Sequence, residues 1–142
     1  QPDPRLPAVE RVAGLTTETT ARAYPFPLLA EQGVVEDEFA GRPIVLFHKA
    51  GVSSALDARQ ISQGKDVGAV AVYERTADGQ ALSFSADGKG TFIDSQTQST
   101  WNILGEAIAG PLAGTRLTEI IHFDHFWFAW AAFFPQTELY GE

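Results

Sequence analysis

Three histidines and one aspartate are the residues of this chain best suited to bind a transition metal. His122, Asp124 and His125 lie within four positions of one another, and His48 directly follows a run of apolar residues. On an extended chain His122 and Asp124 share one face, and His125 lies where a following helix would begin. A helix N-terminus disfavours imidazolium, so His125 would stay neutral and able to bind. Three imidazoles and a carboxylate suit zinc or copper.

The alternative for these residues is structural. Asp124 would then cap the helix, while each histidine bonds a backbone carbonyl or lies at the surface. In that case the chain needs no cofactor. We favour this alternative and keep the metal site as the competing prediction.

A second polar cluster surrounds one tryptophan. Asp94, Ser99, Trp101 and Asn102 concentrate hydrogen-bonding groups around an indole ring, and they are the predicted ligand-binding residues for a small molecule. The alternative is an aspartate-initiated turn, in which the carboxylate bonds nearby backbone N–H groups and the indole packs beneath it.

No recognisable catalytic set accompanies these clusters. The run GVSSA at Gly51–Ala55 nearly matches the GxSxG motif of serine hydrolases. That motif needs a strand, a turn and a helix within an α/β-hydrolase sheet, which this short, strand-rich chain does not supply. Cysteine is absent, which excludes disulfides and thiolate catalysis. We predict no catalytic residue and lean towards a protein that is not an enzyme.

Short apolar runs separated by Gly, Pro and Asp indicate strands and turns. Ile44–Phe47 is a continuous apolar run, typical of a strand buried on both faces. Asp78-Gly79 predicts a hairpin turn. Further strands are expected over 67–75, 81–85 and 91–94, as a meander, and over 117–123. We expect a mainly β (α+β) fold: a twisted, mostly antiparallel sheet or a partly closed barrel, with one short C-terminal aromatic helix.

The segment after His122 predicts that helix. Asp124 would cap it and Pro135 would end it. Four aromatic residues recur at helical spacing: Phe126, Trp127, Trp130 and Phe134. The helix should therefore be buried against the sheet, unless its rings form an exposed docking surface for another subunit.

The length and the first residues bear on domain organisation and compartment. At 142 residues the chain suits one domain, with 1–8 as a disordered or extended tether and 9–142 as a single β-rich domain. The Pro-rich opening QPDPRLP, without an initial Met, is typical of a mature terminus. Absence of both Cys and Met fits an oxidising compartment. We predict an extracytoplasmic protein (secreted, periplasmic or cell-surface), compatible with a lipid or membrane anchor upstream of Gln1.

The net charge and the hydropathy of the chain limit the classes of partner that it can bind. A formal net charge of -8 makes nonspecific binding to nucleic acid or anionic membranes unfavourable. No run approaches the roughly 20 apolar residues that span a bilayer. The expected partner is a protein or a small ligand.

Several blocks in one order resemble the bacterial and archaeal family called domain of unknown function 3179. ARAYP at Ala21–Pro25 is similar to a family motif, DSQTQSTW at Asp94–Trp101 is similar to its DRETGSxW, and GPLAGTRL at Gly110–Leu117 matches its GPLAGxRL. The resemblance extends from Val9 onward. It implies a secreted protein or lipoprotein and assigns no catalytic residue.

One departure from the family pattern concerns the predicted metal ligand. Many members carry YCPLCG directly after the strand that corresponds to Ile44–Phe47, whereas this chain reads FHKAG. The first cysteine of that pair falls near His48, and the second has no counterpart. A thiol-redox role is therefore lost, while imidazole could still replace thiolate for copper or zinc.

These observations favour a noncatalytic extracytoplasmic domain that binds a protein or small ligand as an accessory subunit of an envelope assembly. The alternative is a zinc- or copper-binding protein or metalloenzyme that uses His48, His122 and His125.

Overall fold

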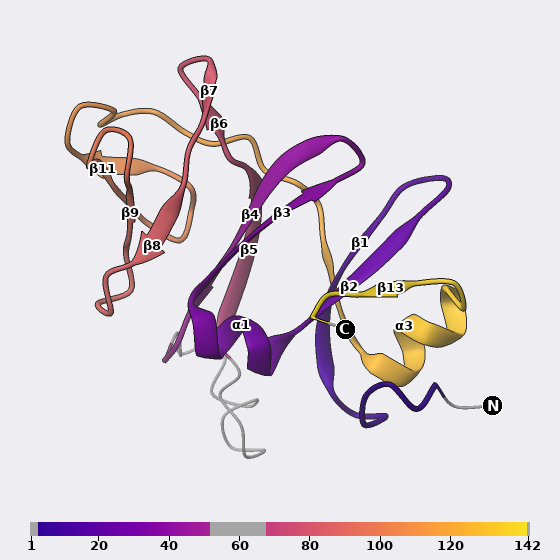
Figure 1. The fold of residues 1–142 in the computed structure, drawn as a ribbon. Helices are drawn as coiled ribbons and strands as arrows, with labels where there is room; N and C mark the ends of the chain where they lie inside the picture. The colour runs from indigo at the N-terminus through magenta and orange to yellow at the C-terminus, as the bar shows by residue number, and fades with distance from the viewer. Residues whose placement is uncertain (1–2, 52–67, 142) are drawn as a thin grey trace. The chain divides into compact units, whose positions relative to one another are not determined.

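The computed structural model describes residues 3–51 and 68–141, which form two compact units (Figure 1). Unit 1 comprises residues up to Leu28 together with those from Ile121 onward, and unit 2 comprises Leu29–Ile120. The sequence predicts a single domain over 9–142. In the structure, the residues make most of their contacts within one or the other of these two units. Most of the GVSSA motif lies outside the described residues.

Unit 1 is a four-stranded sheet carrying one helix. Its order is β12-β1-β2-β13, antiparallel except for β13, which runs parallel to β2. The elements are β1 (Arg11–Thr16), β2 (Ala21–Pro25), β12 (Phe123–Phe126), α3 (Trp127–Phe133) and β13 (Glu138–Leu139). Helix α1 (Phe26–Gln32) leads into unit 2 and ends at Gly33, whose φ of 75° breaks the helix.

The predicted C-terminal helix is present as α3, and it packs on β1. Trp127, Trp130 and Ala131 are buried against Val12, Ala21 and Ala23 of the sheet. Gly14 makes room for this packing, because a Cβ there would lie 2.4 Å from Trp130 Cη2. The two tryptophans therefore form part of the core of unit 1, as expected for a helix that packs on the sheet.

Unit 2 contains two small sheets and a hairpin, all antiparallel. The sheet orders are β3-β4-β5, β11-β10-β9-β8 and β6-β7. The elements are β3 (Val34–Phe39), β4 (Arg42–Lys49), β5 (Ala69–Glu74), β6 (Thr76–Ala77), β7 (Gln80–Ala81), β8 (Phe84–Ala86), β9 (Phe92–Asp94), β10 (Thr100–Trp101) and β11 (Ala107–Ala109).

Strand β4 lies at the centre of the core of unit 2. Ile44–Phe47 has no exposed surface, which confirms the strand predicted to be buried on both faces. The Phe47 ring stacks on Phe92, with centroids 4.1 Å apart, and meets Phe84 edge-on at 5.2 Å. Phe84 in turn meets Trp101 edge-on at 5.7 Å. This chain of rings joins the two sheets of the unit.

Two strand predictions differ from the structure. The expected meander is split, because β5 pairs with β4 while β8 pairs with β9. The strand expected over 117–123 is reduced to an isolated bridge between Tyr73 and Glu119. Hydrogen bonding to β1 instead begins at Phe123 and continues to Phe126.

The fold class is confirmed: strands dominate, the sheets are antiparallel apart from β13, and no closed barrel forms among the described residues. Within residues 3–51 and 68–141, neither helix has the length and hydropathy that a bilayer-spanning helix requires.

Candidate functional site

The predicted ligand residues Asp94, Ser99 and Trp101 form one buried network in unit 2. All three are 0% exposed. The Asp94 Oδ1 atom accepts hydrogen bonds from Trp101 Nε1 at 2.8 Å and from the Ser99 N–H at 3.2 Å. Oδ2 accepts one from the Thr97 N–H at 2.6 Å. Both carboxylate oxygens are thus engaged by protein groups.

The hydroxyl groups of the network join two loops. Thr97 Oγ1 lies 2.9 Å from Asp94 Oδ2 and 2.7 Å from Ser99 Oγ. Ser99 Oγ also accepts a hydrogen bond from the Leu112 N–H at 2.9 Å. Gly110 permits this approach, since a Cβ there would lie 2.7 Å from Ser99 Cα. The network therefore fastens the GPLAG loop to the turn that begins at Asp94.

These hydrogen bonds set the ionisation of Asp94. Burial raises the pKa of a carboxyl group, but the hydrogen bonds from Trp101, Thr97 and Ser99 outweigh burial and lower the pKa of Asp94. The carboxylate is charged at neutral pH and stabilised by the surrounding N–H groups. This arrangement matches the structural alternative, in which an aspartate turn lies over an indole; a ligand role for these residues stays a prediction.

Asn102, the fourth predicted ligand residue, shapes an adjacent loop. Its Oδ1 accepts hydrogen bonds from the N–H groups of Leu104 and Glu106, both at 3.0 Å. Its Nδ2 donates to Glu106 Oε1 at 3.1 Å. Asn102 therefore fixes Glu106, which in turn forms an ion pair with Arg116.

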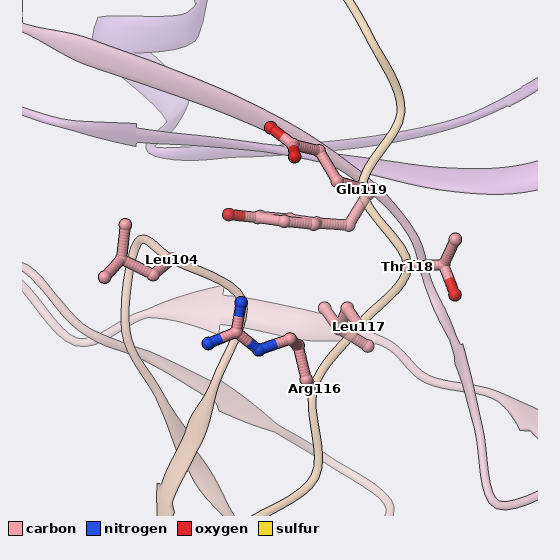
Figure 2. A pocket seen from close by; sticks show the side chains of 6 residues that line it. Leu104, Arg116, Leu117, Thr118 and Glu119 are labelled. Carbon is pink, nitrogen blue, oxygen red and sulfur yellow. The ribbon is translucent and has the colours of Figure 1, made fainter.

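This loop forms one wall of an open pocket of about 520 Å³ in unit 2 (Figure 2). Figure 2 shows that the opposite wall is a single passing segment, which carries Arg116, Leu117, Thr118 and Glu119, while Leu104 faces it. Tyr73 completes the lining. Arg116 lies in the GPLAGTRL motif, whereas no sequence signal marked Tyr73.

Tyr73 is held as a hydrogen-bond donor. Its hydroxyl donates to the Ile103 carbonyl at 2.6 Å, and Gly105 lies against its ring, where a Cβ would be 2.7 Å from Cε1. Burial raises the pKa of Tyr73 to about 12, with the negative charge of Glu119 adding to the effect. A phenol of this pKa stays protonated at neutral pH and is not an activated nucleophile.

The predicted metal ligands are distributed over the two units. His122 and Asp124 lie together in unit 1, with Nε2 and Oδ1 3.1 Å apart, as their shared face predicts. The His125 ring lies 5.9 Å from the Trp130 ring and 6.4 Å from that of Phe123. His48 is in unit 2, at the end of β4, and is 8% exposed.

Within the described ranges 3–51 and 68–141, no three His, Cys, Asp or Glu side chains are grouped so that they could hold one ion. A zinc or copper site stays a prediction that elemental analysis of untagged protein tests directly. Stoichiometric metal that disappears in His122→Ala would support it.

The predicted helix cap is wrong. Asp124 lies within β12, and Phe126 is the N-cap, with φ −76° and ψ 147° and no side-chain cap. The first free N–H groups of α3 are bonded by backbone instead: Trp127 donates to Glu10 O at 2.7 Å and Phe128 to Ala8 O at 2.9 Å. Since His125 lies on the strand, the proposed effect of a helix N-terminus on it does not apply.

One of these acceptors, Ala8, belongs to the segment 1–8 that was predicted to be a tether. Residues 3–8 contact α3 through Asp3, whose carbonyl accepts from Trp127 Nε1 at 3.0 Å, and through Arg5, whose guanidinium lies 5.2 Å from the Trp127 ring. The hydrogen bond from Arg5 lowers the pKa of Asp3. This segment forms part of the surface of unit 1.

The aromatic residues of β12 and α3 are divided between the core and the surface of unit 1. Trp127 and Trp130 are 0% and 1% exposed, whereas Phe126 and Phe128 are 44% and 52% exposed. The two phenylalanine rings stack, with centroids 6.1 Å apart and planes inclined by 13°. Other exposed apolar residues of unit 1 include Ile121, Phe123 and Phe133.

Phe128 also lines an open groove of about 440 Å³. The remaining lining is mostly apolar, with one ion pair: Asp3, Pro4, Arg5, Ala131, Ala132 and Pro135. We call Phe126, Phe128 and this groove the aromatic surface. The sequence predicted an aromatic helix here. It did not predict that Phe126 pairs with Arg11 at the end of β12 and is exposed, because no local pattern indicates this strand register.

Comparison with known proteins places the chain in one family. The family model described as "Protein of unknown function (DUF3179)" matches residues 1–137. No curated protein matches the chain, and no solved structure matches it. The match covers nearly the whole chain and agrees with the motif resemblance. The chain therefore belongs to the DUF3179 family.

Proposed function

We propose that this protein is a noncatalytic binding domain that docks a partner protein through the aromatic surface, as an accessory subunit of an envelope assembly. The observation that carries the proposal is the stacked pair Phe126 and Phe128, each about half exposed beside an apolar groove. Contiguous exposed apolar surface of this kind marks interaction sites in soluble proteins.

The adjacent strand offers a second element of recognition. β12 is an edge strand, paired with β1 on one side and with no strand on its other side among the described residues. An extended segment can add to such an edge through main-chain hydrogen bonds. Phe126 ends β12 and stacks on Phe128, so the edge and the groove are continuous.

The geometry therefore suits an extended apolar segment of the partner. Such a segment would run along β12 and place one apolar side chain in the groove beside Phe128. Buried aromatic anchors of this type dominate protein–protein affinity. Arg11 supports the site, since its guanidinium lies 5.5 Å from the centroid of the Phe126 ring in a cation–π contact.

An extracytoplasmic location is part of the proposal. The absence of Cys and Met fits an oxidising compartment, and the family resemblance implies secreted proteins or lipoproteins. Fractionation of the native host, with the chain detected by antibody, tests this location. Recovery in the cytoplasmic fraction alone would contradict it.

The docking proposal is tested by site-specific photocrosslinking in the native host. A photoreactive phenylalanine analogue at position 128 should capture one partner, which is identified and purified. Phe128→Ser should then weaken binding of that partner about thirtyfold or more, because an aromatic anchor is lost. Affinity is measured by calorimetry with the full chain.

Phe133 supplies the matched control. It lies on the same helix, is 75% exposed, and is not part of the groove lining. Phe133→Ser should change the affinity less than about twofold, which corresponds to a few tenths of a kcal/mol. Equal effects of the two variants, or equal crosslinking from both positions, would refute the proposed surface. Concentration-dependent dimers lost in Phe128→Ser would assign the surface to a second copy and refute the accessory role.

A further inference from the structure

A pocket of about 570 Å³ in unit 2 gathers positive charge in an acidic protein. Its walls are the end of α1, the end of β4 and the turn between β8 and β9. His48, Lys49 and Lys89 line it, opposed by one carboxylate, that of Glu31. The formal net charge of the whole chain is -8, so this local excess of cations is unlike the rest of the sequence.

Lys49 is directed onto the turn by its packing. A Cβ at Gly90 would lie 2.8 Å from Lys49 Cε and 3.5 Å from Nζ, so the lysine side chain crosses directly over that glycine. Gly90 also has a φ of 88°, which favours glycine. The ammonium group of Lys49 is thus held beside the turn that carries Lys89.

His48 is fixed next to Lys49 by a close contact with Gly68. A Cβ at Gly68 would lie 2.6 Å from both Cε1 and Nε2 of the imidazole. His48 is 8% exposed, and its N–H donates to the Gly33 carbonyl at 2.9 Å. The ring therefore has a defined position in the pocket wall.

The acidic residue of the turn is engaged by the turn itself. The Asp87 carboxylate accepts hydrogen bonds from the N–H groups of Lys89 at 2.7 Å and Thr91 at 3.2 Å, and from the Thr91 hydroxyl. Asp87 is not among the lining residues. Its charge stabilises the turn and leaves the ammonium group of Lys89 outside an ion pair.

Lys49 and Lys89 differ in their ion pairing from four of the arginines. Four arginines form ion pairs with carboxylates: Arg5, Arg22, Arg42 and Arg116. Lys49 and Lys89 form no such pair with any residue in 3–51 or 68–141. Two ammonium groups that face one concavity without carboxylate partners attract an anion.

We infer that this pocket binds a small anionic ligand, a carboxylate or a phosphate, between Lys49 and Lys89 with His48 in its wall. The site is independent of the aromatic surface, because its residues belong to unit 2. Each ammonium group donates charge-assisted hydrogen bonds to the oxyanion. The inferred role is recognition of a charged small molecule, in addition to docking of a protein.

The inference is tested by titrating the full chain with inorganic phosphate and, separately, with succinate at low ionic strength. Saturable shifts of the Gly88–Thr91 amides and the His48 ring are expected in NMR spectra at millimolar ligand. The tighter of the two ligands identifies the anion class. Lys49→Met and Lys89→Met should each weaken binding about tenfold, as expected for loss of one charge-assisted hydrogen bond.

Arg42→Met is the matched control, because Arg42 lies at the opposite end of β4 and is exposed. It removes one positive charge and should leave the affinity within about twofold. Thermal unfolding checks that every variant is folded. Absence of saturable shifts with both anions, or equal weakening by Arg42→Met, would overturn the inference and leave the docking proposal unaffected.

Discussion

The core of unit 2 and helix α3 of unit 1 use phenylalanine side chains in opposite ways. In unit 2 the rings of Phe47, Phe92 and Trp101 are at most 1% exposed and belong to one cluster of ring contacts, which Phe84 completes. In helix α3 of unit 1 the buried rings are Trp127 and Trp130, while Phe128 and Phe133 are 52% and 75% exposed. Phenylalanine is thus a core residue in unit 2 and a surface residue on helix α3 of unit 1.

In a chain rich in aromatic residues, the exposure of a ring distinguishes those that pack in the core from those that can contact a partner. A buried ring stabilises the fold, whereas an exposed ring contributes little to it and gains free energy only when a partner covers it. The indoles of unit 1 satisfy their N–H groups locally, with Trp130 donating to Thr137 Oγ1 at 2.8 Å. The two indoles are thus held in the core, while Phe128 and Phe133 on the same helix are exposed.

The largest predicted effect is a contrast between two phenylalanine substitutions. Phe92→Ala removes a ring stacked 4.1 Å from Phe47 and should lower the free energy of unfolding by about 3–5 kcal/mol. Phe133→Ala should change it by less than about 0.5 kcal/mol, because the ring is mostly exposed. Denaturant unfolding followed by circular dichroism measures both. Similar losses would remove the distinction between the units.

Asp94→Asn tests the polar part of the unit 2 core. Each oxygen of Asp94 accepts a hydrogen bond from an N–H group, so either orientation of the amide places its NH₂ against a donor. The free energy of unfolding should fall by about 2–3 kcal/mol. Asp78→Asn is the control, because Asp78 is exposed on a turn with φ 53°, which Asn tolerates.

The pH dependence of this difference follows from the lowered pKa of Asp94. A carboxyl group with a lower pKa in the folded state contributes stability above its unfolded pKa of about 3.9, and that contribution is lost as the pH falls through the folded pKa. The difference between wild type and Asp94→Asn should therefore be largest at neutral pH and shrink below about pH 4. A difference that is constant down to pH 3 would contradict an ionised Asp94.

Sequence patterns predicted the elements whose signals are local. The apolar run Ile44–Phe47 is a buried strand, Asp78-Gly79 forms the hairpin turn between β6 and β7, and α3 ends before Pro135. Each signal depends on a few neighbouring residues and on backbone geometry, which hold in any tertiary context.

Features set by contacts between distant segments could not be predicted in this way. Asp124 was expected to cap a helix, but pairing of Arg11 with Phe126 extends β12 through that position. The same register decides that Phe126 is exposed while Trp127 is buried. The pockets likewise combine Tyr73 with Arg116, and Lys49 with Gly90, which no spacing relates.

The smallest predicted effect is that of Gly14→Ala, which tests the packing of Trp130 on β1 in unit 1. Gly14→Ala places a methyl group 2.4 Å from the ring, which is held by Thr137 and by Phe134, whose ring centroid is 4.4 Å away. The free energy of unfolding should fall by about 1–2 kcal/mol.

In a Trp130→Phe background the smaller ring leaves space, so Gly14→Ala should lower the free energy of unfolding by less. A double-mutant cycle from denaturant unfolding measures this coupling. Additive costs would mean that the indole does not pack on β1, and the separation of buried tryptophans from exposed phenylalanines on α3 would lose its structural basis.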